Sequence, residues 1–257
     1  MKRLDVALTE RGLARSRSQA GQLIAQGKVL INGAQAAKNS VKVSDEDVLE
    51  LEGPEPYASR GAGKLEPVLR AFGVRAEGLT CLDAGASTGG FTDVLLREGA
   101  KRVFAVDIGE GQLVPDLAAD ERVTVRDHCN VRFLSEEDIG GRADLTVADL
   151  SFISLPKVLP ALAACTSEDG ILLPMVKPQF EVGKAKIGNR GVVTDPALRR
   201  EAVQSVIEAG AALGWNTTAV TPSPLPGPSG NVEFFAHMKH GRPAMSAEEI
   251  RAVVESV

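Results

Sequence analysis

The hydrophobic pattern of the opening segment predicts a small α+β domain over residues 1–52. Two amphipathic stretches predict helices near 4–11 and 16–26, and the runs "KVLING" and "VLELE" predict short strands. Ser16 is suited to capping the second helix. "ING" indicates a hairpin, because Asn and Gly tolerate the positive φ of a tight turn. The run "GPEP" suits neither helix nor strand, so we predict an interdomain linker over residues 53–59.

Beyond the linker, apolar runs alternate with amphipathic stretches, as in a mostly parallel sheet covered by helices. The predicted strands are 79–84, 102–108, 123–127, 144–150, 170–176, 216–222 and 232–239. The predicted helices lie near 64–72, 90–98, 155–165 and 196–213, with a closing helix in "SAEEIRAVVESV". The loop "SPLPGPSGN" joins the last two strands as a hairpin. We therefore expect a seven-stranded, Rossmann-like α/β sheet with an antiparallel edge over residues 60–257.

Composition excludes several classes of protein. The chain has 257 residues, of which 44% are hydrophobic and 25% charged, as in an ordinary globular protein. Its three cysteines form no Cys-x-x-Cys pair, so we expect neither a disulfide framework nor a bound metal. No window reaches the ~20 apolar residues of a membrane span, and the N-terminus lacks the apolar core of a signal peptide. We expect a cytoplasmic monomer with no membrane partner.

A glycine-rich turn, "CLDAGASTGGFTDVLL", joins a predicted strand to a predicted helix. Glycines there let the backbone approach a ligand, and the helix N-terminus offers free N–H groups. The dinucleotide fingerprint does not fit, because Ser87 stands at its second glycine, and no Gly-Lys-[Ser/Thr] phosphate loop follows. Asp83 and Asp107 close neighbouring strands, where a carboxylate can bind the ribose hydroxyls of adenosine. The turn resembles the S-adenosylmethionine site of class I methyltransferases; a tight turn without a ligand is the alternative.

The resemblance implies S-adenosylmethionine as the cofactor. We expect Asp107 to bind its ribose and Asp127 to face its adenine, with a solvated loop acid as the alternative for Asp127. The predicted cofactor residues are Asp83, Gly85, Ser87, Gly89, Gly90, Phe91, Asp107 and Asp127.

The segment after the fourth predicted strand narrows the choice of methyl acceptor. Enzymes that methylate exocyclic amines usually carry [Asn/Asp/Ser]-Pro-Pro-[Tyr/Phe] there, whereas this chain has "ADLSFIS". Methylation of a cytosine carbon needs a nucleophilic cysteine, and Cys81, Cys129 and Cys165 stand in no such motif. Oxygen nucleophiles remain.

Six segments resemble one family. "SRGAGKL", "DAGASTGGFT", "ADLSFISL", "PMVKPQFE", "RGVVTD" and "GNVEFFAH" are similar to segments of the TlyA, or haemolysin A, family. Its members are ribosomal-RNA ribose 2′-O-methyltransferases with an FtsJ-like fold. The resemblance covers nearly the whole chain and implies methylation of a cytidine ribose in 23S rRNA and, in some members, also in 16S rRNA. Because the chain begins close to its Arg-Leu-Asp motif, as one-site members do, we expect 23S rRNA as the main target.

The resemblance also implies a catalytic tetrad of Lys64, Asp149, Lys177 and Glu233. The last three stand at or near predicted strand ends, where ligands bind in open α/β sheets. Lys177 follows a buried-type strand, where a charge needs a partner or a function; for Lys64 a solvated lysine at a helix start is the alternative. A ribose hydroxyl must lose its proton as it attacks. We expect Lys177 to accept that proton or to orient the oxygen, and Lys64 to steer the oxygen from the other side.

The net charge of -5 hides a basic opening segment, in which residues 1–44 hold eight basic and two acidic residues. "KRLDVALTERGLARSRSQAGQLIAQGKVLING" resembles the RNA-binding domain named after the fourth small-subunit ribosomal protein. It implies a ribosomal RNA or ribosomal subunit as partner, held by phosphate contacts; a solubilising face is the alternative. The predicted RNA contacts are Arg3, Arg15, Arg17, Lys28 and Arg60.

Few aromatic residues are present, so we expect recognition of RNA shape and backbone rather than base stacking. Two other classes of function compete with the methyltransferase. A membrane-active haemolysin lacks support, because no strongly amphipathic basic helix is evident. An RNA-binding protein without catalysis conflicts with the four intact tetrad positions.

Overall fold

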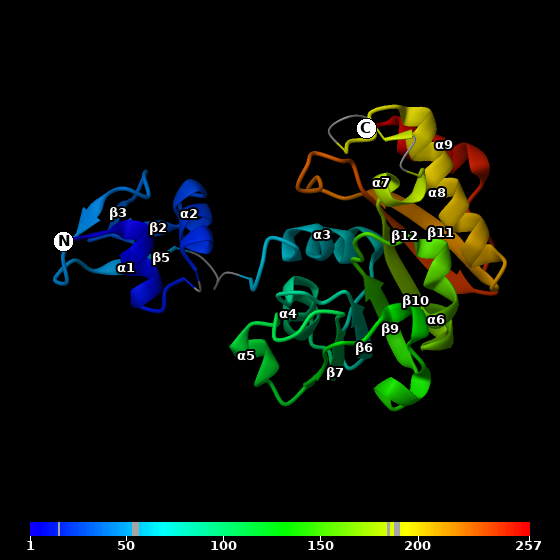
Figure 1. Cartoon of the computed structure of the whole chain (residues 1–257), viewed down its shortest axis with the longest axis horizontal. Helices are drawn as coiled ribbons and strands as arrows, with labels where there is room; N and C mark the ends of the chain where they lie inside the picture. The colour runs from blue at the N-terminus through cyan, green and yellow to red at the C-terminus, as the bar shows by residue number, and fades with distance from the viewer. Residues whose placement is uncertain (15, 53–56, 184–185, 188–190) are drawn as a thin grey trace. The chain divides into compact units, whose positions relative to one another are not determined.

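The computed structural model describes residues 1–14, 16–52, 57–183, 186–187 and 191–257. These residues form two compact units, Met1–Ser59 and Arg60–Val257, which we describe separately (Figure 1). The predicted RNA contact Arg15 and residues 53–56 of the predicted linker lie outside the described residues.

The first unit has the predicted α+β composition. Its elements are β1 (Lys2–Arg3), α1 (Leu4–Glu10), α2 (Arg17–Ala25), β2 (Val29–Ile31), β3 (Ala34–Gln35), β4 (Lys42–Val43) and β5 (Leu49–Leu51). Ser16 caps α2 as predicted, because its side chain accepts a hydrogen bond from the Gln19 backbone. Asn32 and Gly33, at φ 51° and 80°, turn β2 into β3 and confirm the predicted hairpin.

The second unit is a seven-stranded sheet between helices. Its helices are α3 (Ala62–Phe72), α4 (Gly90–Arg97), α5 (Pro115–Ala118), α6 (Leu159–Ala164), α7 (Pro178–Glu181), α8 (Pro196–Ala211) and α9 (Ala247–Glu255). Its strands are β6 (Thr80–Ala84), β7 (Arg102–Val106), β8 (Val123–Arg126), β9 (Ala143–Ala148), β10 (Thr166–Val176), β11 (Trp215–Pro222) and β12 (Phe234–His240). The strands lie in the order β11-β12-β10-β9-β6-β7-β8. All seven predicted strands are present, so the predicted α/β fold is confirmed.

The antiparallel pairing of the last two strands lies at the edge of the sheet, as predicted. β12 runs antiparallel to both β10 and β11, so it is an interior strand and β11 forms the edge. The predicted hairpin of the last two strands thus forms the antiparallel edge of the sheet, and the strand that runs against the others, β12, is one place in from that edge. Burial gives the physical reason, since Phe234, Phe235 and Ala236 are consecutive and all fully buried, as a strand covered on both faces requires.

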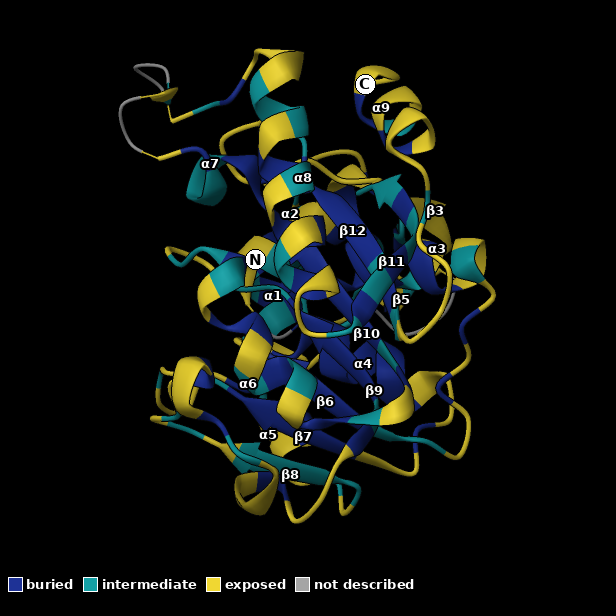
Figure 2. Ribbon diagram, turned by 90° about the vertical axis from the view of Figure 1, so that its right-hand side faces the viewer, coloured by how far each residue is buried: buried dark blue, intermediate teal, exposed yellow. Residues whose placement is uncertain are grey.

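Helices cover both faces of the sheet. α3 and α4 lie on one face, and α6, α8 and α9 on the other (Figure 1). Buried residues follow the strands, whereas exposed residues occupy the outer sides of α6, α8 and α9 (Figure 2). The predicted helix over 155–165 is divided into a 3₁₀ turn, Leu155–Lys157, and α6, because Pro156 and Pro160 each lack a backbone donor. The sequence did not predict the four-residue helices α5 and α7.

Strand direction brings distant residues together at the carboxyl ends of the parallel strands. Ala84, Val106 and Ala148 end the parallel strands β6, β7 and β9 and pair in register. The antiparallel β12 begins at this same end of the sheet, where Phe234 pairs with Val176, the last residue of β10. The turns that follow β6, β7, β9 and β10 therefore meet the segment that precedes β12.

Replacing Leu82 by alanine tests the importance of this core. Leu82 lies in β6 and is fully buried, so we expect Leu82→Ala to lower the free energy of unfolding by about 2–5 kcal/mol. Leu213→Ala is the control, because Leu213 is 38% exposed, and we expect a change within about 0.5 kcal/mol. Urea unfolding followed by fluorescence of Trp215, the chain's single tryptophan, measures both. Equal losses in the two variants would contradict this description of the core.

Candidate active site

Four charged side chains lie together at the carboxyl ends of the parallel strands. Lys64 Nζ lies 2.7 Å from Glu233 Oε2 and 3.8 Å from Asp149 Oδ2. Lys177 Nζ lies 2.5 Å from Asp149 Oδ1 and donates a hydrogen bond to Ser151 Oγ at 3.2 Å. Lys64, Lys177 and Glu233 are 5%, 7% and 1% exposed. Buried charges are costly unless they are paired. Each lysine of this cluster therefore needs its carboxylate partner, and each carboxylate needs its lysine.

Each member of the cluster comes from a different element. Lys64 is the third residue of α3, Asp149 follows β9, Lys177 follows β10 and Glu233 precedes β12. The structure thus brings together the four residues of the predicted tetrad, whose catalytic role stays a prediction. The alternative of a solvated Lys64 is wrong, because its ammonium group is buried against Glu233.

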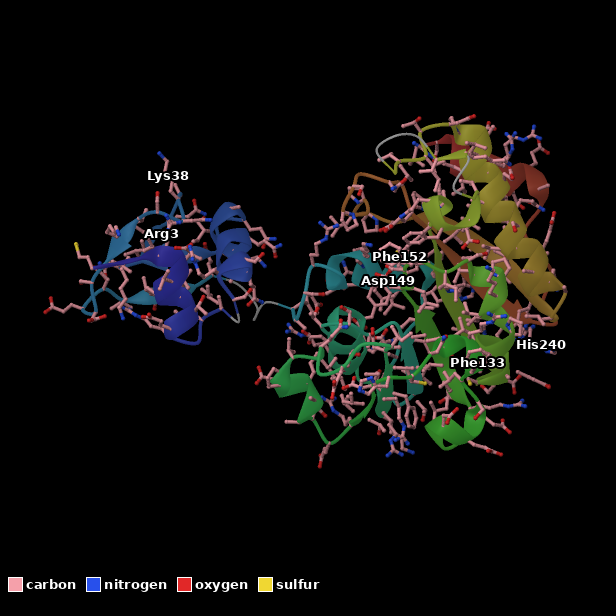
Figure 3. The ribbon with its side chains drawn as sticks, viewed as in Figure 1. Arg3, Lys38, Phe133, Asp149, Phe152 and His240 are labelled. Atoms are coloured by element: carbon pink, nitrogen blue, oxygen red, sulfur yellow. The ribbon has the colours of Figure 1, made fainter. Side chains whose placement is uncertain are left out.

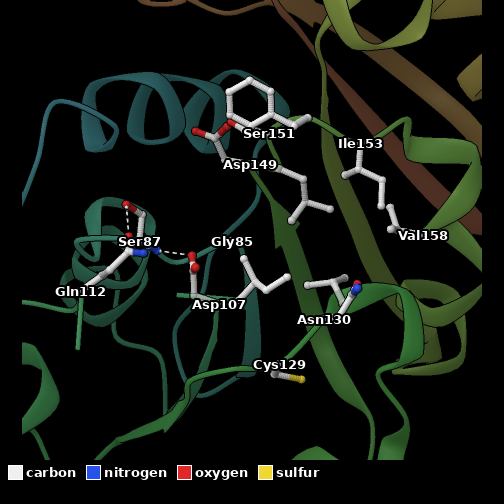
Figure 4. A pocket seen from close by; sticks show the side chains of 14 residues that line it. Gly85, Ser87, Asp107, Gln112, Cys129, Asn130, Asp149, Ser151, Ile153 and Val158 are labelled. Carbon is white, nitrogen blue, oxygen red and sulfur yellow. Dashed lines mark hydrogen bonds between the residues drawn. The ribbon is translucent and has the colours of Figure 1, made fainter. Parts of the chain in front are cut away.

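A pocket of about 580 Å³ lies beside the cluster, and Asp149 belongs to both (Figure 4). Three predicted cofactor residues, Gly85, Ser87 and Asp107, line it. The Asp107 carboxylate accepts hydrogen bonds from the backbone N–H of Ser87 and of Gly109, both at 2.8 Å. These two donors fix the carboxylate and leave it further lone pairs for a ligand.

Gly85 allows the turn to pass closely against the end of β9. Its φ is +88°, a conformation that L side chains rarely adopt. A Cβ atom there would lie 2.7 Å from the Asp149 carbonyl oxygen and 3.0 Å from the Leu150 side chain. The glycine is therefore required both by backbone conformation and by space.

The other predicted cofactor residues do not line the pocket. Asp83 and Gly90 are buried, and Gly89, at φ +97°, precedes α4. The Phe91 ring packs into the core 6.0 Å from the Phe235 ring, and Asp127 accepts a hydrogen bond from the Gly111 backbone at 2.8 Å. These contacts give Phe91 and Asp127 structural roles, and their contact with a cofactor stays a prediction.

Sequence reasoning missed several residues that line the pocket. Ile108 was predicted as the end of strand 102–108, but β7 ends at Val106; Cys129 and Asn130 come from the irregular segment after β8, where no periodicity marks them. Ile108 carries the one usable signal. It is an apolar residue directly after Asp107 in a polar loop, and it is 69% exposed.

Phe152 was also missed. It lines the pocket, is 91% exposed and has a φ of +63°, which is uncommon for a residue other than glycine. Figure 3 shows Phe152 near Asp149. The Phe152 ring lies 5.2 Å from the Phe180 ring, and Lys177 Nζ lies 5.8 Å from the centre of the Phe180 ring. The expectation of no base stacking rested on the small number of aromatic residues, yet an exposed ring stands at the site.

In the first unit, two predicted RNA contacts share one carboxylate. Arg3 Nε and Arg17 Nη2 each lie 2.9 Å from Asp5, which is 4% exposed. Hydrogen bonds from Arg3 first, and then from Arg17, lower the pKa of Asp5 to about 2. The guanidinium side chains remain 42% and 63% exposed, so they are fixed in place and accessible. Lys28 is half-buried.

Arg60 belongs to the second unit. Its Nη2 donates a hydrogen bond to the Pro226 carbonyl at 2.9 Å, which fixes it against the loop before β12. An RNA contact by Arg60 stays a prediction. Within the part of the chain that the structure describes, no group of three or more His, Cys, Asp or Glu residues is placed to hold a metal ion. The helices of this part include none that is long and apolar enough to cross a membrane.

Asp83 is a buried carboxyl group directly before the glycine turn. Its Oδ2 accepts a hydrogen bond from Thr92 Oγ1 at 2.7 Å, whereas Oδ1 has no hydrogen-bond partner among the residues described. Burial raises the pKa of Asp83 from 3.8 to about 7, although the hydrogen bond from Thr92 opposes the shift.

This raised pKa makes stability depend on pH. Between about pH 4 and 7 the folded state keeps the Asp83 proton and the unfolded state releases it, so the free energy of unfolding falls as the pH rises. The loss is about 4 kcal/mol at most. We expect the wild type to lose stability between pH 5 and pH 8 relative to Asp83→Asn, as measured by urea unfolding. An equal difference at both pH values would contradict the assignment.

Comparisons with known proteins agree with this architecture. Residues 57–240 match the model of the FtsJ-like methyltransferase family, and residues 2–49 match the S4 domain. The 16S/23S rRNA (cytidine-2′-O)-methyltransferase TlyA of Mycobacterium tuberculosis is 53% identical over 92% of this chain and 89% of its own. The 23S rRNA (cytidine-2′-O)-methyltransferase TlyA of Campylobacter jejuni is 33% identical over 91% and 97%. A solved structure of a candidate hemolysin from Streptococcus thermophilus aligns with a TM-score of 0.77 at 38% identity, over 99% and 94%.

The sheet order, the glycine turn and these matches define a methyltransferase of FtsJ-like fold that carries an S4 domain. Within that class, the chain belongs to the TlyA family. The resemblance found in the sequence is confirmed.

Proposed function

We propose that this protein transfers a methyl group from S-adenosylmethionine to the 2′-hydroxyl of a cytidine ribose in ribosomal RNA. The observation that carries the proposal is the buried cluster of Lys64, Asp149, Lys177 and Glu233 at the edge of a ligand-sized pocket. The names of both TlyA relatives suggest the substrate. Both name 23S rRNA cytidine 2′-O-methylation, and the more similar relative also names 16S rRNA. We propose 23S rRNA as the target, with 16S rRNA as a second one.

The residues of the pocket fit S-adenosylmethionine. Gly85 lines the pocket where the turn packs closely against the end of β9, and Asp107 offers a fixed carboxylate to ribose hydroxyls. When bound, the sulfonium supplies an electrophilic methyl group.

The cluster suits the orientation of a ribose oxygen. Asp149 holds the Lys177 ammonium group at 2.5 Å, and an ion-paired ammonium is a hydrogen-bond donor rather than a proton acceptor. Lys177 would then donate to the ribose oxygen and turn a lone pair toward the methyl group. The hydroxyl proton would pass to a solvent water as the new C–O bond forms and the C–S bond of the sulfonium breaks. Glu233 fixes Lys64 on the other side of Asp149. Such positioning accounts for a large part of the rate in a reaction between two bound groups.

RNA recognition is divided between the two units. Arg3 and Arg17, fixed by Asp5 and exposed, suit phosphate groups, which position the RNA without reading its sequence. Phe152 at the pocket suits stacking on a base. Because ribosomal RNA is the proposed substrate, we propose that the enzyme acts in the cytoplasm and as a monomer. For a membrane-active function, the described residues offer no comparable observation.

Methyl transfer to isolated ribosomal subunits tests the proposal. Wild type with tritium-labelled S-adenosylmethionine is expected to label RNA in unmodified large subunits, and weaker labelling of small subunits would mark the second target. Lys177→Ala removes the group that orients the oxygen, so we expect its rate to fall by about 100-fold or more.

Lys101→Ala is the matched control, because Lys101 is exposed and lies after α4, outside the pocket and the charged cluster. It is expected to keep wild-type activity. If neither the large nor the small subunit is labelled although the cofactor binds, the ribosomal substrate is refuted. Full activity of Lys177→Ala would refute the role of the cluster.

A further inference from the structure

We propose that Gln179 is a positioning residue for methyl transfer, whose side-chain amide fixes the Glu233 carboxylate and, through it, Lys64. The kinetic part of this inference rests on the proposed function. The contact itself does not.

The two oxygens of Glu233 have separate donors. Gln179 Nε2 donates to Oε1 at 3.1 Å, and Lys64 Nζ donates to Oε2 at 2.7 Å. Glu233 is 1% exposed, and a Cβ atom at Gly227 would lie 2.7 Å from the same Oε1. The loop backbone therefore closes over this oxygen and leaves little room for water to replace the amide. Without Gln179, Lys64 would be the one remaining side-chain donor to the Glu233 carboxylate among the described residues, and Oε1 would lose the contact that fixes it.

The local fold places Gln179 next to Lys177. Pro178 occupies the first position of α7, where its missing N–H costs nothing, so the helix begins directly after Lys177. Glu181, at the end of the same turn, accepts hydrogen bonds from the Leu155 backbone at 2.8 Å and from Ser154 Oγ at 2.7 Å. One helical turn thus fixes the segment before β12 through Gln179 and the segment after β9 through Glu181. Lys177 immediately precedes this turn, at the end of β10, which lies between β12 and β9 in the sheet.

A neutral amide suits this position better than a charged group. The cluster already contains two lysines and two carboxylates, and Gln179 adds a donor without adding charge. Its carbonyl, Oε1, is buried and makes no hydrogen bond within the described part of the chain. Burying an unpaired carbonyl costs free energy. The favourable contribution of the Gln179 side chain therefore comes from its N–H donor, which binds Glu233.

Two substitutions separate positioning from bulk. Gln179→Met keeps the size of the side chain and removes the donor, so we expect kcat to fall by about 10-fold with KM for S-adenosylmethionine within about twofold of wild type. Gln179→Glu places a carboxylate against Glu233. As the pH falls, protonation restores a donor, and the activity relative to wild type is expected to rise. A merely structural role predicts no such recovery.

Gln204→Glu is the matched control. Gln204 Nε2 donates to Glu208 Oε1 at 2.9 Å, the same kind of contact on the exposed side of α8. We expect this variant to keep the kcat and pH profile of wild type. A kcat for Gln179→Met within about twofold of wild type would overturn the positioning role.

An unfolding experiment tests the contact without relying on activity. Gln179→Met is made in wild type and in a Glu233→Met background, and the urea midpoint is followed by Trp215 fluorescence. We expect a clear downward shift in the first background and a much smaller one in the second. Equal shifts would overturn the contact. A wild type that transfers no methyl group would refute the proposed function, and the midpoints would still decide whether Gln179 holds Glu233.

Discussion

The structure of the site depends on the burial of two lysines at the edge of a sheet. An ammonium group without a partner at 5% or 7% exposure would cost several kcal/mol, so each lysine needs a carboxylate within ion-pair distance. Asp149 and Glu233 meet that need, but they are 84 positions apart in the chain and come from different strands. The interior, antiparallel placement of β12 satisfies the requirement, because it brings the start of β12 beside the end of β10. Removal of either carboxylate would leave a buried positive charge.

Asp149 connects this cluster to the pocket. Its side chain pairs with Lys177 and contacts Lys64, whereas its carbonyl oxygen limits residue 85 to glycine. The end of β9 therefore borders both the pocket, where we propose that the methyl donor binds, and the charged cluster, where we propose that the acceptor oxygen is held. This shared residue explains why the glycine turn and the charged cluster, which are distant in sequence, form one site.

Much of this molecule is predictable from sequence because its patterns are local. The seven strands follow from apolar runs, and Ser16 and Asn32-Gly33 mark a helix start and a turn by local chemistry. The four charged residues were identified through family resemblance; Asp149, Lys177 and Glu233 also stand at or near predicted strand ends, and Lys177 follows a buried-type strand. The interior position of β12 was missed, because strand pairing is a non-local choice that loop length does not fix. Phe152 and Ile108 were missed because they stand in irregular segments, and Gln179 because α7 is too short to show a period.

The identity of the methylated atom tests the central claim most directly. Ribosomal RNA that lacks the modification is incubated with the wild-type protein and S-adenosylmethionine carrying a trideuterated methyl group, then digested to nucleosides for mass spectrometry. A site that orients a ribose oxygen predicts the deuterated methyl group on the ribose of cytidine. A deuterated methyl group on a base, or on no nucleoside, would contradict it.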